Sequence, residues 1–271
     1  NPPTRFKGTL GVLKRVAWCD PLPLAEVKAV GKALDATVND VLMACAAGAL
    51  RAYLLERGDQ VDGLSIRATI PVNLRPLEHA KELGNHFGLV FLDLPIGIEN
   101  PVARLQAVRE NMQQLKHSRQ AVMSFGLLSA LGVGPAALQR PALEMLSRKA
   151  TTVATNVPGP QQPLYLCGTP VREMMFWVPQ SGSIGMGISI LSYAGSVYFG
   201  LIADSRRIPD PGRIIERFGP ELEKLLLIAL MHDGDGPITP ELAERLLASR
   251  AAPVAPKKRP ASRSRRAHNK A

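Results

Sequence analysis

The sequence predicts an α+β fold, because helical patterns and strand patterns both recur along the chain. Its 271 residues are 46% hydrophobic and 21% charged, which is enough apolar material for a packed core. Residues 41–50 are apolar nearly all round, as in a helix buried inside a domain. Several strand patterns follow residue 151, and the last two are spaced as a hairpin.

The N-terminal third begins with a helical pattern. Leu24 to Lys32 predicts a short helix, and Thr37-Val-Asn-Asp40 is a capping box that opens a second one. In such a box the Thr and Asp side chains satisfy free amides at the helix start. The apolar run Val41 to Leu50 continues this helix, and Gly58 ends it.

Strands and helices alternate in the middle of the chain. Ser65 to Asn73 alternates apolar and polar residues, which indicates a half-buried strand, and Phe87 to Leu94 predicts a second strand. Asn100-Pro101 is an N-cap and N1 pair for a helix that ends near His117. Residues 121–131 and 141–149 are also expected to be helical.

Strand patterns dominate the next stretch. We expect strands at 151–157, 171–178, 184–192 and 197–203, with Tyr193-Ala-Gly-Ser196 as the turn of a hairpin. An amphipathic helix over 214–229 and a short one over 239–250 follow. These predictions complete the ordered part of the chain.

The positive charge is concentrated in the last twenty-one residues. The chain has 33 Lys and Arg against 23 Asp and Glu, but seven of those bases lie in 251–271, which has no acid. The remainder therefore has 26 bases against 23 acids, so a basic nucleic-acid-binding surface is not indicated. The composition of 251–271 predicts a disordered basic tail.

The residues form no complete catalytic or metal-binding constellation. The five histidines do not occur at metal-ligand spacing, and the glycine-rich stretch 182–187 is neither a dinucleotide fingerprint nor a P-loop. The three cysteines, Cys19, Cys45 and Cys167, form no C-x-x-C pair and indicate neither a disulfide framework nor a zinc site. We expect a reducing compartment, no metal and no cofactor.

Five blocks of sequence together carry a resemblance to a known family. In order along the chain they are Ala36-Thr-Val-Asn-Asp-Val-Leu-Met-Ala44, Ile70-Pro-Val-Asn-Leu-Arg75, Gly84-Asn85 running on to Leu94-Pro95, Thr155-Asn-Val-Pro-Gly-Pro160, and Ser192-Tyr-Ala-Gly195 followed by Asp204 and Pro209-Asp210. The chain from about Pro2 to Leu230 resembles the bacterial wax ester synthase/acyl-CoA:diacylglycerol acyltransferase (WS/DGAT) family.

The resemblance implies the C-terminal half of a CoA-dependent acyltransferase fold, similar to chloramphenicol acetyltransferase, with a mixed sheet and flanking helices. It implies that residues 1–60 are a linker and helices from the end of the N-terminal acyltransferase domain. Residues 61–250 would be the WS/DGAT C-terminal domain, followed by the tail 251–271. The N-terminus has no initiator Met, so the chain is expected to be a piece of something longer.

The implied site residues do not include a catalytic base. The family's H-H-x-x-x-D-G motif, whose second His is the proposed general base, is absent from these 271 residues and is expected in the N-terminal half. Asn39 and Asp40 match a motif thought to support the active site, although the capping box explains them structurally. The matching turn Asn156, Pro158 and Gly159 would lie near the substrate tunnel.

One further stretch is a candidate for the tunnel wall. Met175 and Trp177 lie in the uncharged run Met174-Met-Phe-Trp177, which either faces the acyl chain or forms an ordinary core strand. The residues do not decide between the two.

The implied activity is transfer of a long-chain acyl group from acyl-CoA to diacylglycerol or a long-chain alcohol, giving triacylglycerol or wax ester. Acyl-CoA is then a substrate rather than a cofactor. The expected partners are these lipids, the N-terminal half, and a peripheral membrane or lipid-droplet surface, with no specific nucleic acid. The expected location is the cytoplasm or the inner face of the plasma membrane.

Two other classes of function stay open. The chain is alternatively a non-catalytic module that binds an acyl chain or CoA, or, on the strength of the tail alone, a nucleic-acid-associated protein. Acyl-chain length, acceptor preference and oligomeric state are not determined by the residues.

Overall fold

The computed structural model describes residues 2–75, 86–232, 234 and 236–251. Within them a seven-stranded mixed sheet has the order β1-β9-β8-β5-β3-β4, and β2 also pairs with β9. β5 runs parallel to both β3 and β8, whereas the other pairs are antiparallel. The strands are β1 (Lys14–Trp18), β2 (Leu22–Pro23), β3 (Ile66–Asn73), β4 (Phe87–Leu94), β5 (Thr152–Pro158), β8 (Met186–Tyr193) and β9 (Ser196–Asp204).

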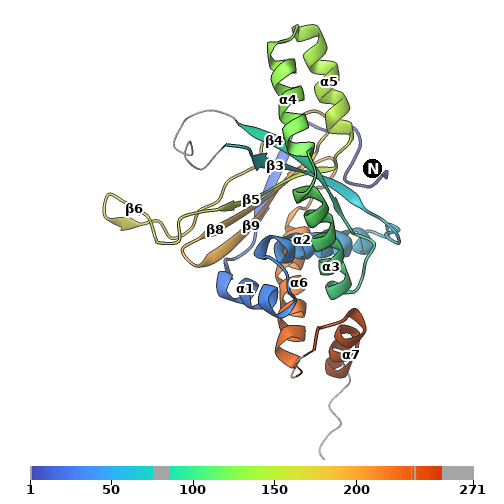
Figure 1. Cartoon of the computed structure of the whole chain (residues 1–271), viewed down its shortest axis with the longest axis vertical. Coiled ribbons are helices and arrows are strands. Elements are labelled where there is room, and N and C mark those ends of the chain that lie inside the picture. The colour runs from blue at the N-terminus through green and yellow to red at the C-terminus, as the bar shows by residue number, and fades with distance from the viewer. Residues whose placement is uncertain (1, 76–85, 233, 235, 252–271) are drawn as a thin grey trace, which may run out of the picture.

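Helices cover one face of this sheet (Figure 1). The covering helices are α1 (Leu24–Ala33), α2 (Val38–Glu56), α3 (Pro101–Lys116) and α6 (Gly212–Met231), with α7 (Pro240–Ala251) against α3 and α6. α4 (Gln120–Val133) and α5 (Ala136–Arg148) form a hairpin that projects from the top of the molecule in Figure 1. The small sheet of β6 (Tyr165–Leu166) and β7 (Thr169–Pro170) lies at the end of an arm. The expected mixed sheet with flanking helices is confirmed.

α2 is the central core helix. Most of it is buried, including Cys45, Ala49 and Leu50 at 1% exposure or less, because its apolar residues contact both the sheet and α6. It is also the one described helix that is long and apolar enough to cross a membrane, but 78% of that window is buried inside the protein. The sequence prediction of a buried domain helix is therefore confirmed.

The two faces of the sheet differ in what covers them. Ile66 and Ala68 of β3 point into the core beneath the helices, and Thr69 points to the second face. Residues 171–181 cross this second face without strand structure. A Cβ atom on Gly200 of β9 would collide with Met175 and lie 3.0 Å from Trp177, so this segment packs directly on the sheet.

The predicted strand at 171–178 is therefore wrong. β8 is paired on both sides, with β5 and β9, and β9 is paired with β8 and with β1 and β2. No open edge is left beside them for another strand. The segment is apolar because it packs on the face of the sheet, not because it belongs to the ladder.

Most other elements agree with the sequence predictions. The hairpin of β8 and β9 is confirmed, and its turn residues Ala194 and Gly195 have φ of +47° and +83°. α5 begins at Ala136 rather than at Pro141, which lies inside the helix. β1 was not predicted, because its five residues, Lys14 to Trp18, do not alternate between apolar and polar.

Residues on both sides of the expected division at residue 60 share one core. Phe6 and Val41 belong to the same buried cluster as Leu92 and Phe218, and β1 pairs with β9. The assignment of residues 1–60 to the end of another domain stays a prediction about a longer protein. The expected basic tail, apart from Ala251, and the Gly84-Asn85 motif lie outside the described residues.

Candidate functional site

The structure brings together two of the predicted motifs, although 117 residues separate them. Asn39 lies in the first turn of α2, and Asn156 lies near the end of β5. The side-chain amide of Asn156 donates a hydrogen bond to Oδ1 of Asn39, with 3.1 Å between the two atoms. The pair ties the start of the core helix to the end of a central strand.

Asp40 completes the capping box that the sequence predicts. Its Oδ2 accepts hydrogen bonds from the backbone nitrogen of Thr37 at 2.9 Å and from Oγ1 of Thr37 at 2.7 Å. In return Oγ1 of Thr37 accepts from the backbone nitrogen of Asp40 at 3.2 Å. Asp40 is 3% exposed, and its Oδ1 has no hydrogen-bond partner within the described structure, so one acceptor remains available beside Asn39.

We expect Asp40→Ala to lower the free energy of unfolding by about 0.5–2 kcal/mol, because two N-terminal groups of a buried helix lose their partner. Urea denaturation of the 271-residue chain measures this. Thr37→Ala removes the other half of the same box, so the double variant should cost less than the sum of the single ones. If Asp40→Ala unfolds at the parent's urea concentration but inactivates an enzyme reconstituted with an N-terminal half, the capping explanation is wrong and a direct role in the reaction is favoured.

Pro158 is the last residue of β5, and Gly159 begins the turn that follows it. The backbone nitrogen of Gly159 donates to the carbonyl oxygen of Ser192 at 2.8 Å, and a Cβ atom on Gly159 would lie only 2.5 Å from that oxygen. Glycine is therefore needed for the close approach of the turn to β8. This contact accounts for the residue structurally, and the predicted place of both residues near a tunnel stays a prediction.

An apolar cavity of about 560 Å³ lies on the second face of the sheet. No Asp, Glu, Lys, Arg or His side chain lines it. β3, β4, β5, the hairpin of α4 and α5, and the segment after residue 175 form its walls. The lining residues are Thr69, Pro71, Phe87, Leu89, Phe91, Leu128, Leu146, Ser147, Val153, Thr155, Phe176, Val178, Pro179, Gln180, Ser181 and Ile184.

The predicted wall residues lie beside this cavity. Phe176 and Val178 line it, whereas Met175 and Trp177 pack on Gly200, and Trp177 makes an edge contact with Trp18. Phe176 belongs to the run Met174 to Trp177 that the sequence singled out as a candidate wall, whereas Val178 was not predicted. Leu89, Phe91 and Val153 were not predicted as site residues, because only the structure shows that they alternate with core residues such as Leu92 and Ala154 and face the other side of the sheet.

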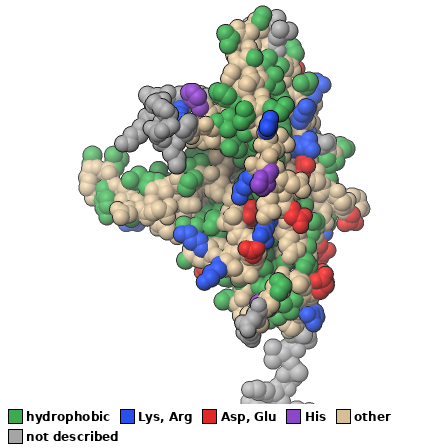
Figure 2. All heavy atoms as spheres, viewed as in Figure 1, with side chains coloured by type: hydrophobic (Ala, Val, Ile, Leu, Met, Phe, Trp, Pro, Cys, Tyr) green, Lys and Arg blue, Asp and Glu red, His purple; other side chains and the backbone are tan. Residues whose placement is uncertain are grey.

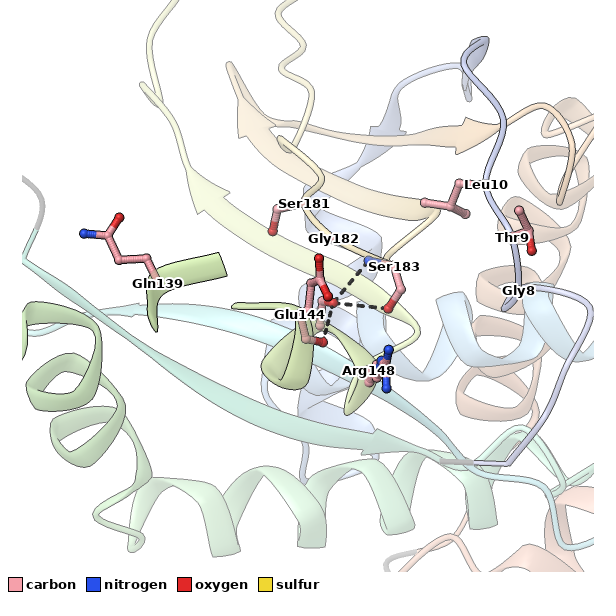
Figure 3. A pocket seen from close by; sticks show the side chains of 10 residues that line it. Gly8, Thr9, Leu10, Gln139, Glu144, Arg148, Ser181, Gly182 and Ser183 are labelled. Carbon is pink, nitrogen blue, oxygen red and sulfur yellow. Dashed lines mark hydrogen bonds between the residues drawn. The ribbon is translucent and has the colours of Figure 1, made fainter. Parts of the chain in front are cut away.

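A second, more polar cleft of about 680 Å³ adjoins the apolar cavity (Figure 3). Ser147 and Ser181 line both spaces. Glu144 and Arg148 of α5 lie on one side of the cleft, and the segment 8–10 lies on the other. Oγ of Ser147 accepts from the backbone nitrogen of Ser183 at 3.1 Å, which fixes α5 to the loop between the two spaces.

The histidines that the structure describes do not line either space. The exposed His86 stacks on Phe125 at 6.0 Å between ring centroids and lies 3.4 Å from Arg75. Within the described residues, no three His, Cys, Asp or Glu side chains gather as metal ligands.

Together the apolar cavity and the adjoining polar cleft suit a ligand with a long apolar part and a polar part.

Comparison with known proteins gives a consistent result. Residues 83–226 match the model of the WS/DGAT C-terminal domain. A putative diacylglycerol O-acyltransferase of Mycobacterium bovis, Mb3154c, is 30% identical over 228 residues, which are 83% of this chain and 49% of that protein. The chain thus spans about half the length of the relatives it matches.

Solved structures agree with the predicted fold. The wax ester synthase/diacylglycerol acyltransferase from Marinobacter aquaeolei VT8 is 25% identical with a TM-score of 0.65, covering 85% of this chain and 53% of that one. The epimerization domain from the third module of tyrocidine synthetase B has a TM-score of 0.50 at 12% identity, and the match covers 88% of this chain and 49% of that one. The latter likeness concerns the fold alone.

Proposed function

The chain belongs to the WS/DGAT family, and from this premise we propose that it forms part of an O-acyltransferase that transfers a long-chain acyl group from acyl-CoA to diacylglycerol or a long-chain alcohol. The names of its relatives support this class of reaction. The observation that carries the proposal is the charge-free cavity beside a polar cleft, since a fatty acyl thioester has an apolar chain and a polar carrier.

The proposed reaction exchanges a thioester for an oxygen ester. The acceptor hydroxyl oxygen forms a bond to the acyl carbonyl carbon, the bond between carbon and sulfur breaks, and the hydroxyl proton ends on the sulfur of CoA. A positioned base for that proton is worth about 10²- to 10⁴-fold in rate. We propose that an N-terminal half with the H-H-x-x-x-D-G motif supplies the base, and that this chain supplies acyl binding. The scheme needs acyl-CoA only as substrate and no further cofactor.

The strand that lines the cavity also carries one of the two paired amides, Asn156. Val153 and Thr155 of β5 line the cavity, and the next residue, Asn156, points to the opposite face and bonds to Asn39. The strand thus connects the proposed acyl site to the motif thought to support the active site. We propose that the pair of amides is a positioning element, because it fixes the end of β5.

The proposed partners follow from the substrates. Diacylglycerol and fatty alcohols reside in membranes and lipid droplets, so a peripheral association with such a surface is proposed. The proposed location is the cytoplasm or the inner face of the plasma membrane.

We expect Val153→Phe to weaken binding of palmitoyl-CoA by about tenfold, since overpacking typically costs 1–3 kcal/mol and each 1.4 kcal/mol is tenfold. Displacement of a fluorescent fatty acid from the 271-residue chain measures the affinity. Val157→Phe is the matched control, because it lies on the same strand and the same side but outside the cavity lining. Equal affinities of the two variants would place the acyl chain elsewhere.

A further inference from the structure

The hairpin of α4 and α5 has an apolar outer surface that no described part of the protein covers. None of the residues of α4 is buried, although the helix carries Val, Met, Phe and Leu side chains. Val122 is 64% exposed, Met123 71% and Val133 90%. Figure 2 shows apolar side chains over much of this projecting hairpin. A contiguous apolar surface of this kind indicates a contact with another apolar phase.

The charge pattern around the hairpin identifies the kind of partner. No charged residue occurs from Gln120 to Gln139, which includes all of α4 and the tip. Between residues 111 and 150 there are five Lys or Arg and a single acid, Glu144, and four of the five basic residues, Lys116, Arg119, Arg148 and Lys149, lie where the hairpin joins the rest of the protein. Figure 2 shows Lys and Arg side chains below the hairpin and along one side of it. An apolar hairpin tip with positively charged residues at its foot is complementary to a bilayer whose headgroups are anionic.

The length of the hairpin fits insertion into one side of a membrane. α4 has 14 residues, which gives about 21 Å at 1.5 Å per residue, against about 30 Å for the hydrocarbon core of a bilayer. The helix is therefore too short to span. A helix of this length fits the interface, where the flanking Lys and Arg side chains would reach the headgroups.

The inner side of the same hairpin belongs to the apolar cavity. Leu128 of α4 and Leu146 of α5 line the cavity, and Oγ of Ser124 accepts a hydrogen bond from the backbone nitrogen of Leu89 at 2.7 Å. α4 thus has one apolar side toward the cavity and another toward solvent. We propose that the hairpin docks the protein on an anionic lipid surface and places the cavity beside the lipid from which the acceptor comes.

The role of the cavity in this inference rests on the proposed function, but vesicle binding tests the docking of the hairpin without any enzymatic turnover. The 271-residue chain is mixed with phosphatidylcholine vesicles, with and without phosphatidylglycerol, and bound protein is separated by flotation. We expect Met123→Glu and Val133→Glu each to reduce binding by about tenfold, because each inserts a charge into the apolar contact.

Matched controls exist elsewhere on the surface. Leu230 is 71% exposed, as Met123 is, and Val12 is 95% exposed, close to Val133. Leu230→Glu and Val12→Glu should bind vesicles as the parent does. Deletion of residues 251–271 measures the separate contribution of the tail, which should appear only with phosphatidylglycerol and disappear in salt.

A depth measurement distinguishes insertion from nearby charge. A tryptophan introduced as Val133→Trp should be quenched by brominated lipid, whereas Leu230→Trp should not. Unchanged vesicle binding of Met123→Glu and Val133→Glu, or an equal loss in the controls, would overturn the proposal. So would a result in which these variants only dissociate a dimer of the chain in light scattering, since the hairpin would then be a surface for self-association.

Discussion

Arg104→Ala is expected to lower the free energy of unfolding by about 3–5 kcal/mol, because it leaves the carboxylate of Glu221 buried without its main partner. The guanidinium of α3 contacts Glu221 of α6, and the two side chains are only 3% and 6% exposed. Glu221 keeps one exposed cation, Lys224, at 2.5 Å. That single contact does not replace the lost one.

The remaining donors of Arg104 hold α2 and the start of α3. Nε donates to the carbonyl oxygen of Ala44 at 3.2 Å, and Nη1 donates to those of Ile98 and Glu99 at 3.0 Å. Burial lowers the pKa of Arg104 from its ordinary value, and the charge of Glu221 opposes this effect. Gly48 of α2 makes room for the pair, since a Cβ atom there would collide with Glu221 and lie 2.6 Å from Nη2 of Arg104.

Urea denaturation followed by circular dichroism tests the expected loss. Arg109→Ala is the control, because Arg109 lies on the same helix and pairs with Asp35 at 2.6 Å, with side-chain exposures of 34% and 88%. An exposed pair of this kind contributes about 0–1 kcal/mol. The double variant Arg104→Met with Glu221→Leu should regain most of the stability, since it removes both charges. Equal costs for Arg104→Ala and Arg109→Ala would contradict the assigned role of the buried pair.

This pair shows what periodicity alone does not reveal. The apolar run 41–50 correctly predicted a buried helix, but Gly48 looked like one more small residue in it. Its partners come from α3 and α6, more than fifty residues away. Local patterns determine which face of a helix is apolar, whereas contacts between distant elements depend on the packing of the whole fold.

The site was predictable to a similar degree. Thr37-Val-Asn-Asp40 predicted its own capping box, because all of its partners lie within one helical turn. The resemblance assigned Asn39 to a motif that supports the active site and Asn156 to a turn near the tunnel, and only the structure shows that the two residues bond to each other. For Met175 and Trp177, a period-two reading could not determine which side chains face the cavity, because the segment is not part of a ladder.

The second large effect concerns turnover. We expect the 271-residue chain alone to bind the acyl group of palmitoyl-CoA. We expect it to show no release of CoA that depends on an added acceptor. The residues that line the cavity and the cleft include no histidine, and the chain has no H-H-x-x-x-D-G motif. Without a positioned base, attack by a neutral hydroxyl loses about 10²- to 10⁴-fold, and without the rest of the tunnel it also loses orientation of the two substrates.

Addition of an N-terminal half from a family member that carries the motif should restore turnover with hexadecanol or diacylglycerol as acceptor. CoA release is followed with a thiol reagent, and the same half with its second motif histidine changed to alanine serves as the control. If the parent half restores activity and the control does not, the proposed division of labour is supported. If neither half restores it while palmitoyl-CoA still binds, the chain is instead a non-catalytic acyl-binding module. Acceptor-dependent turnover by the chain alone at ordinary enzyme rates would require a base within these residues, and His86→Ala is then the first variant to measure, because His86 directly precedes the strand that lines the cavity.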